Sequence, residues 1–178
     1  PPHGRSLPSR LNDPAVAIDI GTTTVQVSLV ERPGGETYPL GSFLNPQRRH
    51  GHDVITRIAA SADPLVHASL VRVIRHAVAS AVQTALHGRT VDAEPTGLLV
   101  VSGNTTMTHL FFGLDVRPLG VFPYTAGELD YEGMTLPEGL PASTRVAALP
   151  SASAFLGGDL VGGLALTEET CAGRRVFF

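Results

Sequence analysis

The chain has 178 residues, of which 43% are hydrophobic and 16% charged, and its formal net charge is −3. This composition is typical of a folded domain with a sizeable core and excludes both disorder and the basic footprint of a nucleic-acid-binding protein. No run of apolar residues reaches the roughly 18 that a membrane helix needs, so we expect no membrane partner. A single cysteine, Cys171, excludes a disulfide framework and predicts a cytoplasmic protein.

The N-terminal half predicts a tail followed by a three-stranded meander. Residues 1–14 are rich in proline, serine and arginine, which indicates a flexible tail or linker. Alternating apolar residues then predict three strands joined by tight turns at Gly21 and at Pro33-Gly34-Gly35, over 15–20, 23–31 and 37–43. Strands linked in this way form an antiparallel meander.

Helices and further strands are predicted after the meander. Asp53 predicts the N-cap of a short helix, and Asp63-Pro64 predicts the start of a long one that ends near His87-Gly88. Segment 113–143 has prolines and glycines without a clear period, which indicates an excursion wrapped on the core. The remaining predicted elements are a strand over 97–102, a helix opened by Gly103-Asn104-Thr105-Thr106, a strand over 145–149, a helix over 157–166 and a strand over 174–178.

This order of elements predicts an α/β fold with the ribonuclease-H-like topology of actin-type ATPases. Its sheet is expected to be mixed and five-stranded, with an antiparallel meander and flanking helices. We assign 15–173 to one subdomain that includes the excursion, and 174–178 to the first strand of a second subdomain. Because that strand has no further partner and the chain opens on Pro1 rather than Met, we expect the first half of a larger module or a truncated product.

One turn carries the main candidate chemistry. Asp19 precedes Ile20 and the glycine-threonine run of Gly21, Thr22, Thr23 and Thr24. Such a turn offers backbone N–H groups and hydroxyls to an anion, with a carboxylate beside it, and this combination suits a nucleotide phosphate and its metal. The alternative is an ordinary β-hairpin.

Four segments in this order carry a family resemblance over residues 15–166. The first is the turn that begins at Asp19. The others are Asn45-Pro46-Gln47 with Gly51-x-Asp53-Val54-x-x-Arg57-Ile58, Gly103-Asn104-Thr105-Thr106-Met107-x-His109-Leu110, and Phe155-Leu156-Gly157-Gly158-Asp159-x-x-Gly162-Gly163-Leu164-Ala165. Together they resemble the ATP-dependent reductive activators of corrinoid proteins, within the superfamily of acetate and sugar kinases, heat-shock chaperones and actin.

The resemblance implies ATP and Mg²⁺ as cofactors and a corrinoid protein as partner, with ATP hydrolysis driving low-potential electron transfer to the cobalt. It implies that Asp19 holds Mg²⁺ through water and that Gly21 to Thr24 touch the β- and γ-phosphates. Gly158 is implied to let two helices cross closely, and Asp159 to orient water or metal. Gly103, Asn104 and Thr105 either form a helix cap or bind an anion at the helix start.

Several features of the family are missing from the chain. A second phosphate motif, the adenosine-binding glycine motif and a cysteine-rich domain are absent, so any iron–sulfur cluster is expected in a domain outside this chain. We therefore expect its own second subdomain as a partner and a fragment that is inactive alone. Two alternatives remain open: half of a small-molecule kinase, and a non-catalytic docking module that forms a homodimer through 174–178.

Other polar and aromatic residues receive local interpretations. Arg57 follows Asp53 by four residues, which favours an ion pair along the helix. A loop that either faces a cleft or is solvated is expected to hold Asn45, Gln47, Arg48 and Arg49. The polar face of the long helix is expected to be solvated or, alternatively, to bind the corrinoid partner; it carries His67, Arg72, Arg75 and His76. His109 is expected to be a satisfied interior histidine, and no native metal is expected at His50 and His52. Core or excursion packing is expected for Phe111, Phe112, Phe122 and Tyr124.

Overall fold

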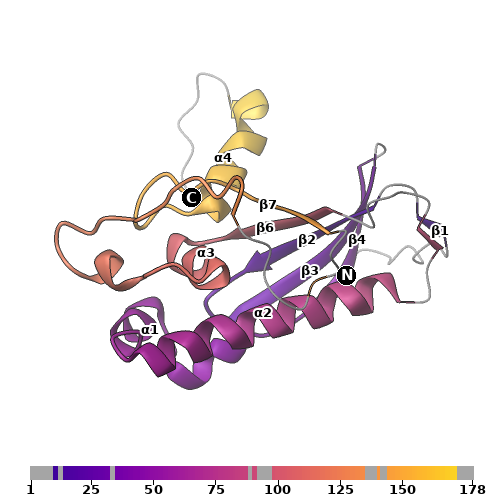
Figure 1. The fold of residues 1–178 in the computed structure, drawn as a ribbon. Helices are drawn as coiled ribbons and strands as arrows, with labels where there is room; N and C mark the ends of the chain where they lie inside the picture. The colour runs from indigo at the N-terminus through magenta and orange to yellow at the C-terminus, as the bar shows by residue number, and fades with distance from the viewer. Residues whose placement is uncertain are drawn as a thin grey trace.

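A five-stranded mixed sheet forms the centre of the computed structural model (Figure 1). The structure describes residues 10–11, 14–32, 35–87, 90–91, 98–134, 140 and 144–171. The strands lie in the order β4-β3-β2-β6-β7, and their bounds are Pro14–Ile20 for β2, Thr24–Glu31 for β3, Glu36–Leu44 for β4, Leu98–Gly103 for β6 and Arg145–Ala148 for β7.

The sheet combines an antiparallel meander with a parallel half. β2 pairs antiparallel with β3, and β3 with β4, whereas β6 runs parallel to both β2 and β7. This arrangement confirms the predicted mixed sheet, and the three meander strands lie within about one residue of their predicted bounds. β2 is the central strand, so the turn that follows it lies at the middle of one edge of the sheet.

The helices begin at the predicted caps. α1 (Val54–Ala60) opens on a capping box between Asp53 and Thr56, and α2 (Pro64–Leu86) opens on Asp63, whose side chain accepts from the Leu65 N–H. Oxygen side chains at these positions satisfy helix N–H groups that have no partner within the helix. The other helical elements are η1 (Pro46–His50), α3 (Thr105–Phe112), η2 (Arg117–Gly120) and α4 (Gly158–Cys171).

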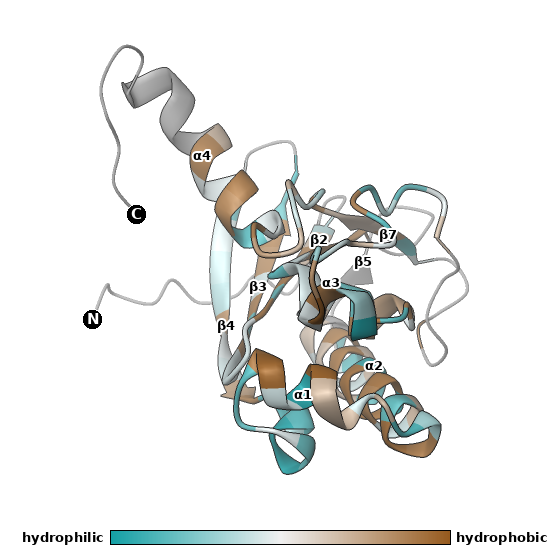
Figure 2. Ribbon diagram, turned by 90° about the vertical axis from the view of Figure 1, so that its left-hand side faces the viewer, coloured by the Kyte–Doolittle hydropathy of each residue, from teal (hydrophilic) through white to brown (hydrophobic). Residues whose placement is uncertain are grey.

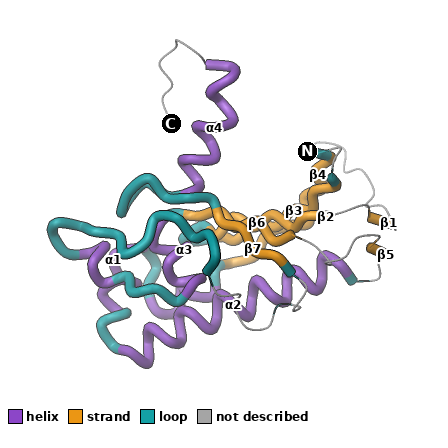
Figure 3. The backbone as a smooth tube through the Cα atoms, turned by 45° about the horizontal axis from the view of Figure 1, so that its top comes forward, coloured by secondary structure: helices purple, strands orange, loops and turns teal. Residues whose placement is uncertain are grey.

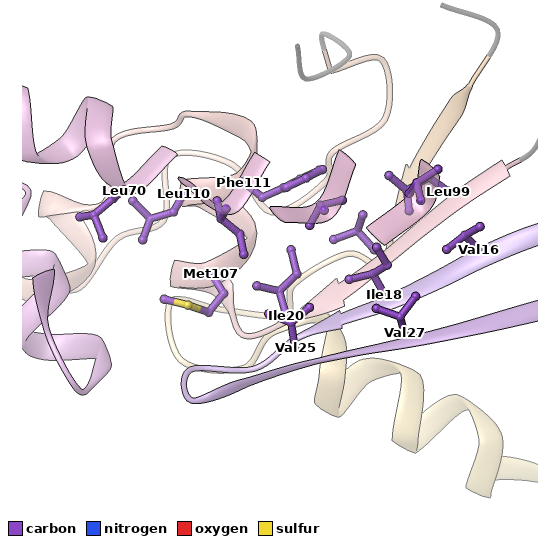
Figure 4. Packing of buried hydrophobic residues seen from close by; sticks show 14 of the residues in the cluster. Val16, Ile18, Ile20, Val25, Val27, Leu70, Leu99, Met107, Leu110 and Phe111 are labelled. Carbon is purple, nitrogen blue, oxygen red and sulfur yellow. The ribbon is translucent and has the colours of Figure 1, made fainter. Parts of the chain in front are cut away.

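The strand alternation separates the two faces of the sheet. Ile18 and Ile20 point into the main core, where they pack with Leu70 of α2 and with Met107 and Phe111 of α3 (Figure 4). The residues between them along β2, including Asp19, face the opposite side. Figures 1 and 4 show α4 on that opposite side of the strands. The sheet therefore brings Asp19 and the start of α4 to the same face.

Helix α2 is long and apolar enough, by length and composition alone, to count as a candidate membrane span over Pro64–Ala85. Figure 2 shows hydrophobic and hydrophilic residues alternating around it. Its hydrophobic side packs on the sheet through fully buried Leu70, Ile74 and Val78. The core helix of a globular domain meets the same criterion.

Several segments differ from the sequence-based expectation. Arg10–Leu11, within the predicted tail, form the short strand β1, which pairs in parallel with β5 (Thr90–Val91). The described part of 113–143 runs mostly as loop close to α3 (Figure 3). Phe122 and Tyr124, expected to pack in the core or the excursion, are exposed by 81% and 46% and so lie outside the core. They pack edge to face on each other, and Tyr124 also packs on Phe155. The strand predicted over 174–178 lies outside the described residues.

Two basic side chains also depart from expectation. On the face of α2 expected to be solvated, Arg72 and His76 are exposed, whereas Arg75 is half-buried because its Nε donates to the Phe111 carbonyl at the end of α3. His109 is fully buried, as expected, and its Nδ1 lies 3.3 Å from the Tyr131 hydroxyl. Its Nε2, however, has no hydrogen-bond partner among the described residues, so this interior histidine is only partly satisfied.

Candidate functional site

The Gly-Thr turn, Gly21–Thr24, joins the end of β2 to the start of β3. A side chain at Gly21 is excluded, because a Cβ there would lie 2.5 Å from the Thr24 carbonyl oxygen. The turn is therefore tight enough to demand glycine at its first position. Thr22 is half-buried and Thr23 is exposed, so part of the turn is open to solvent.

Three backbone carbonyls of the Gly-Thr turn accept hydrogen bonds from Asn45 and Arg57. Asn45 donates from Nδ2 to the Gly21 oxygen at 2.8 Å and from its backbone N–H to the Thr23 oxygen at 2.9 Å. The Thr22 oxygen accepts from Nη2 of Arg57 at 2.5 Å. No described residue accepts a hydrogen bond from the backbone N–H of Gly21, Thr22 or Thr23. The carbonyl oxygens of the turn are therefore engaged within the protein, whereas its backbone N–H groups remain available to a ligand.

Asn104 connects the Gly-Thr turn to the start of α3. Its Oδ1 accepts from the Met107 N–H at 3.0 Å, which makes it the N-cap of the helix. Its Nδ2 donates to Oγ1 of Thr22 at 3.1 Å. Of the two roles left open by the sequence, the structure shows the cap, and it adds a contact with the turn.

The neighbours of Asn104 are packed tightly. Gly103 is buried, and a Cβ there would lie 2.9 Å from the Ile20 carbonyl oxygen. Thr105 is also buried, and its hydroxyl donates to the Ser153 carbonyl at 2.6 Å. Both residues therefore lie within the junction between β6 and α3, with the Thr105 hydroxyl already engaged by the loop that precedes α4.

Asp19 and Asp159 form a pair of carboxylates beside the turn. Asp19 is half-buried near the end of β2, and Asp159 is exposed in the first turn of α4. Burial raises the pKa of Asp19 above its usual value, and the negative charge of Asp159 raises it further. These two residues lie 140 positions apart in the sequence, and their charges interact in the folded chain.

Glycines allow α4 to start close to this pair. A Cβ at Gly157 would lie 2.4 Å from the Asn104 Cα and 2.5 Å from the Gly103 oxygen, and one at Gly158 would lie 2.7 Å from the Leu149 oxygen. Because these obstacles are backbone atoms, neither position accepts a larger residue without movement of the chain. The close approach at Gly158 is to Leu149, just after β7, and not to a second helix, so the helix crossing implied for Gly158 is not what the structure shows there.

The carboxylate pair fits a hydrated Mg²⁺ ion and does not fit a cation enclosed by protein ligands. Within the described ranges, no group of three or more His, Cys, Asp or Glu residues is placed to hold a metal. Mg²⁺ retains several waters and is usually bound by one or two carboxylates together with substrate phosphates. Two carboxylates next to free N–H donors match that pattern.

Arg57 does not form the ion pair that its spacing predicted. Its side chain is fully buried, and its hydrogen bonds end on neutral acceptors: the carbonyls of Gly51 and Thr22, Oε1 of Gln47 and Sδ of Met107. Asp53 instead caps α1. Burial lowers the pKa of Arg57 to about 10. The prediction failed because spacing along a helix does not show which way the helix faces.

Asn45 and Gln47 were expected in a cleft-facing or solvated loop, and both expectations were wrong. Both side chains are buried, with exposures of 1% and 0%. Gln47 donates from Nε2 to the Leu70 carbonyl at 3.0 Å and accepts from Arg57. Together with Arg57, these amides form a polar layer beneath the Gly-Thr turn. The local sequence feature that indicates this layer is the Asn45-Pro46-Gln47 start of η1, where the Asn45 side chain caps the 3₁₀ helix.

Two cavities border α2 rather than the turn. One of about 630 Å³ lies between α2 and β4, next to Phe43 and Ala81, and another of about 810 Å³ lies between α2 and the end of α3, next to Arg72 and Phe112. Neither is lined by Asp19, Asp159 or the Gly-Thr turn. The exposure of Thr23 and Asp159 leaves the candidate site at least partly open to solvent at the end of β2.

Comparisons with known proteins identify the family. Residues 14–169 match the RACo middle region family. The chain is 30% identical over 149 residues to the corrinoid activation enzyme RamQ of Eubacterium limosum, covering 81% of this chain and 25% of that protein. A solved structure of a reductive activator for corrinoid,iron-sulfur protein aligns with a TM-score of 0.73 and 30% identity, over 92% of this chain and 26% of the other.

The chain thus spans about a quarter of the length of these two relatives. The match covers the described elements that build or contact the Gly-Thr turn and the carboxylate pair, namely β2, β3, β4, η1, α1, β6, α3 and the first part of α4. The chain therefore belongs to the RACo middle region family, which is a family of reductive activators of corrinoid proteins.

Proposed function

We propose that this chain forms the phosphate-binding wall of a Mg-ATP site in a reductive activator of corrinoid proteins. One observation carries the proposal: the Gly-Thr turn has its carbonyls hydrogen-bonded inward and its N–H groups free, with Asp19 and Asp159 beside it. Fixed N–H donors stabilise the charge of a phosphoryl group without having to reorganise when it binds.

Each part of the site has a distinct role. The N–H groups of Thr22 and Thr23 and the threonine hydroxyls bind β- and γ-phosphate oxygens. Asp19 holds Mg²⁺ through water, and Asp159 orients a second water of the same shell. When bound, the ion neutralises phosphate charge, which is the main catalytic demand in phosphoryl transfer. Burial and, to a lesser extent, the charge of Asp159 raise the pKa of Asp19, and a bound cation would offset the repulsion between the two carboxylates.

The larger activity is proposed from the relatives. RamQ is named a corrinoid activation enzyme, and the structural neighbour is named a reductive activator for corrinoid,iron-sulfur protein. We extend corrinoid activation to this chain, with ATP hydrolysis driving a low-potential electron to the partner's cobalt. The strand order β4-β3-β2-β6-β7 supports a ribonuclease-H-like subdomain of the actin type. We assign adenosine binding and the iron–sulfur cluster to regions of such proteins beyond the matched quarter.

Nuclear magnetic resonance on the 178-residue chain tests the phosphate wall. The backbone amide signals of Gly21 to Thr24 are followed while Mg-ATP is added, and again while ATP is added with the metal chelated. Because one wall supplies only part of the ligand's contacts, we expect weak but saturable shifts at these four amides. The shifts should be smaller without Mg²⁺.

Two variants separate the site from non-specific binding. Asp19→Asn should abolish the difference between Mg-ATP and metal-free ATP, because it removes the carboxylate that holds the ion. Glu132→Gln removes an exposed carboxylate outside the site and should leave the titration unchanged. Shifts that are absent from the turn, or an Asp19→Asn protein that keeps its full Mg²⁺ dependence, would overturn the proposal.

A further inference from the structure

Arg57 is a buried cation without an acidic partner. Its side chain has 0% exposure, and its guanidinium donates only to neutral acceptors among the described residues. Two charged groups act on it from nearby: Asp53, which is exposed and occupied in capping α1, and Arg48, which has the same sign. Buried charges in proteins are normally paired, so this arrangement leaves a positive charge that the fold itself balances poorly.

The position of the guanidinium indicates what balances it. Nη2 lies 2.5 Å from the Thr22 oxygen, at the middle of the Gly-Thr turn. That oxygen belongs to the same peptide group as the Thr23 N–H, which has no acceptor among the described residues. A charge-assisted hydrogen bond to a carbonyl polarises its peptide group and makes the N–H at the other end a stronger donor. The buried charge therefore acts on whatever binds at Thr23.

We propose that Arg57 is the positioning residue of the Gly-Thr turn, and that a phosphate bound at the Thr23 N–H is the counterion of its buried charge. The inference deepens the proposed function and rests on it. Arg57 touches no ligand; it acts through the Thr22–Thr23 peptide. A lysine cannot reproduce all of these contacts, because the guanidinium that donates to Thr22 also donates to Gly51 and Gln47. These contacts fix the orientation of the Thr22–Thr23 peptide group.

The sharpest test supplies a counterion from within the chain. Gln47→Glu keeps the shape of the side chain and places a carboxylate where Oε1 now accepts from Nη1 of Arg57, at 3.3 Å, at the loss of the Nε2 donation to the Leu70 carbonyl. The arginine and its bond to Thr22 are retained, while its charge is neutralised locally. We expect the affinity of the 178-residue chain for inorganic pyrophosphate, measured from the Thr22 and Thr23 amide shifts, to fall about tenfold. Gln83→Glu adds the same charge at an exposed position of α2 and should change it less than about twofold.

A second pair of variants removes the charge instead. Arg57→Met should weaken pyrophosphate binding by about tenfold or more, and Arg57→Lys should recover part of that loss because it keeps the charge. Arg75→Met is the matched control, since Arg75 is a half-buried arginine that also donates to a backbone carbonyl, away from the turn. A purely structural role for Arg57 predicts equal losses in the Lys and Met variants and full affinity in Gln47→Glu.

The outcomes separate the two proposals. If the wild-type chain shows no pyrophosphate-dependent shift at the Gly-Thr turn, the phosphate wall itself is wrong and this inference falls with it. If the wild type responds while Gln47→Glu keeps its affinity, only the counterion role is overturned. Gln47→Glu also covers the case in which Arg57→Met fails to fold, because it retains every hydrogen bond of the arginine.

Discussion

Asn104 hydrogen-bonds to Thr22 across 82 positions of sequence, and the same amide caps α3. Nδ2 of Asn104 donates to the Thr22 hydroxyl, and Oδ1 accepts from the Met107 N–H, so the contact with the turn and the helix cap depend on different atoms. Substitutions can therefore separate the stability of the helix from the arrangement of the turn.

Asn104→Asp and Asn104→Ala should differ in stability. Aspartate keeps the oxygen that caps α3 and loses only the donor to Thr22, whereas alanine loses both. We expect alanine to lower the free energy of unfolding by about 1–2 kcal/mol and aspartate by less than about 0.5 kcal/mol. Urea unfolding followed by circular dichroism measures both. Equal losses in the two variants would contradict the cap assignment.

Gly157→Ala should destabilise the junction between α4 and the sheet. The added Cβ meets backbone atoms of Asn104, Gly103 and Thr105 at 2.4–2.6 Å, so the start of α4 has to move. Overpacking of this kind costs about 1–3 kcal/mol. The control is Gly127→Ala, since a Cβ at Gly127 has no neighbour within 4 Å. The same urea measurement should show a clear loss for the first variant and almost none for the second.

Asp159→Asn should lower the pKa of Asp19. Burial remains in this variant, but the repulsive charge from α4 is gone, so the pKa moves back toward its ordinary value without reaching it. A raised pKa means that the folded chain binds the proton more tightly than the unfolded chain. The ionised Asp19 therefore costs stability at neutral pH, and this cost disappears as the pH falls through the raised pKa. Carbon-13 titration of the Asp19 carboxyl gives both values, and an unchanged pKa would show that the two carboxylates do not interact.

The stability of the chain should fall as the pH drops below about 6.5, the ordinary pKa of histidine. Burial of His109 lowers its pKa, because the protonated ring loses hydration. For a depressed histidine, stability is complete above the unfolded pKa and is lost as the pH falls toward the folded one. His109→Asn should flatten the dependence of the urea midpoint between pH 7.5 and 5. His52→Asn, at an exposed position, should leave its slope unchanged.

Local patterns were sufficient to predict most of the elements. Alternation of apolar residues located β2, β3 and β4, and the oxygen side chains of Asp53, Asp63 and Asn104 marked three helix starts. These signals work because a strand's faces and a helix cap depend on residues a few positions apart. The motif at Asp19 was likewise visible, since a turn that requires glycine leaves its mark in the sequence.

The polar layer beneath the turn was not predictable in the same way. Asn45, Gln47 and Arg57 look like surface residues in the sequence. They are buried where η1 packs against α2 and where α1 packs against η1 and α3. Their partners lie at Gly21, Leu70 and Thr22, outside any local window. Burial of polar groups depends on distant parts of the chain, so spacing suggested an ion pair for Arg57 where the fold provides a carbonyl.

From the sequence separation of its contacts, we expect the Gly-Thr turn to reach its final form late in folding. The β2–β3 hairpin is local, but the groups that fix its turn follow it by 24 residues for Asn45, 35 for Arg57 and 82 for Asn104. Each added contact requires a longer loop to close, which delays it relative to the hairpin. The nascent hairpin therefore has the sequence of an anion site without its rigidity. Under the proposed function, we expect affinity for phosphate to arise only once α3 has docked, so that a phosphate ligand would favour fully folded chains.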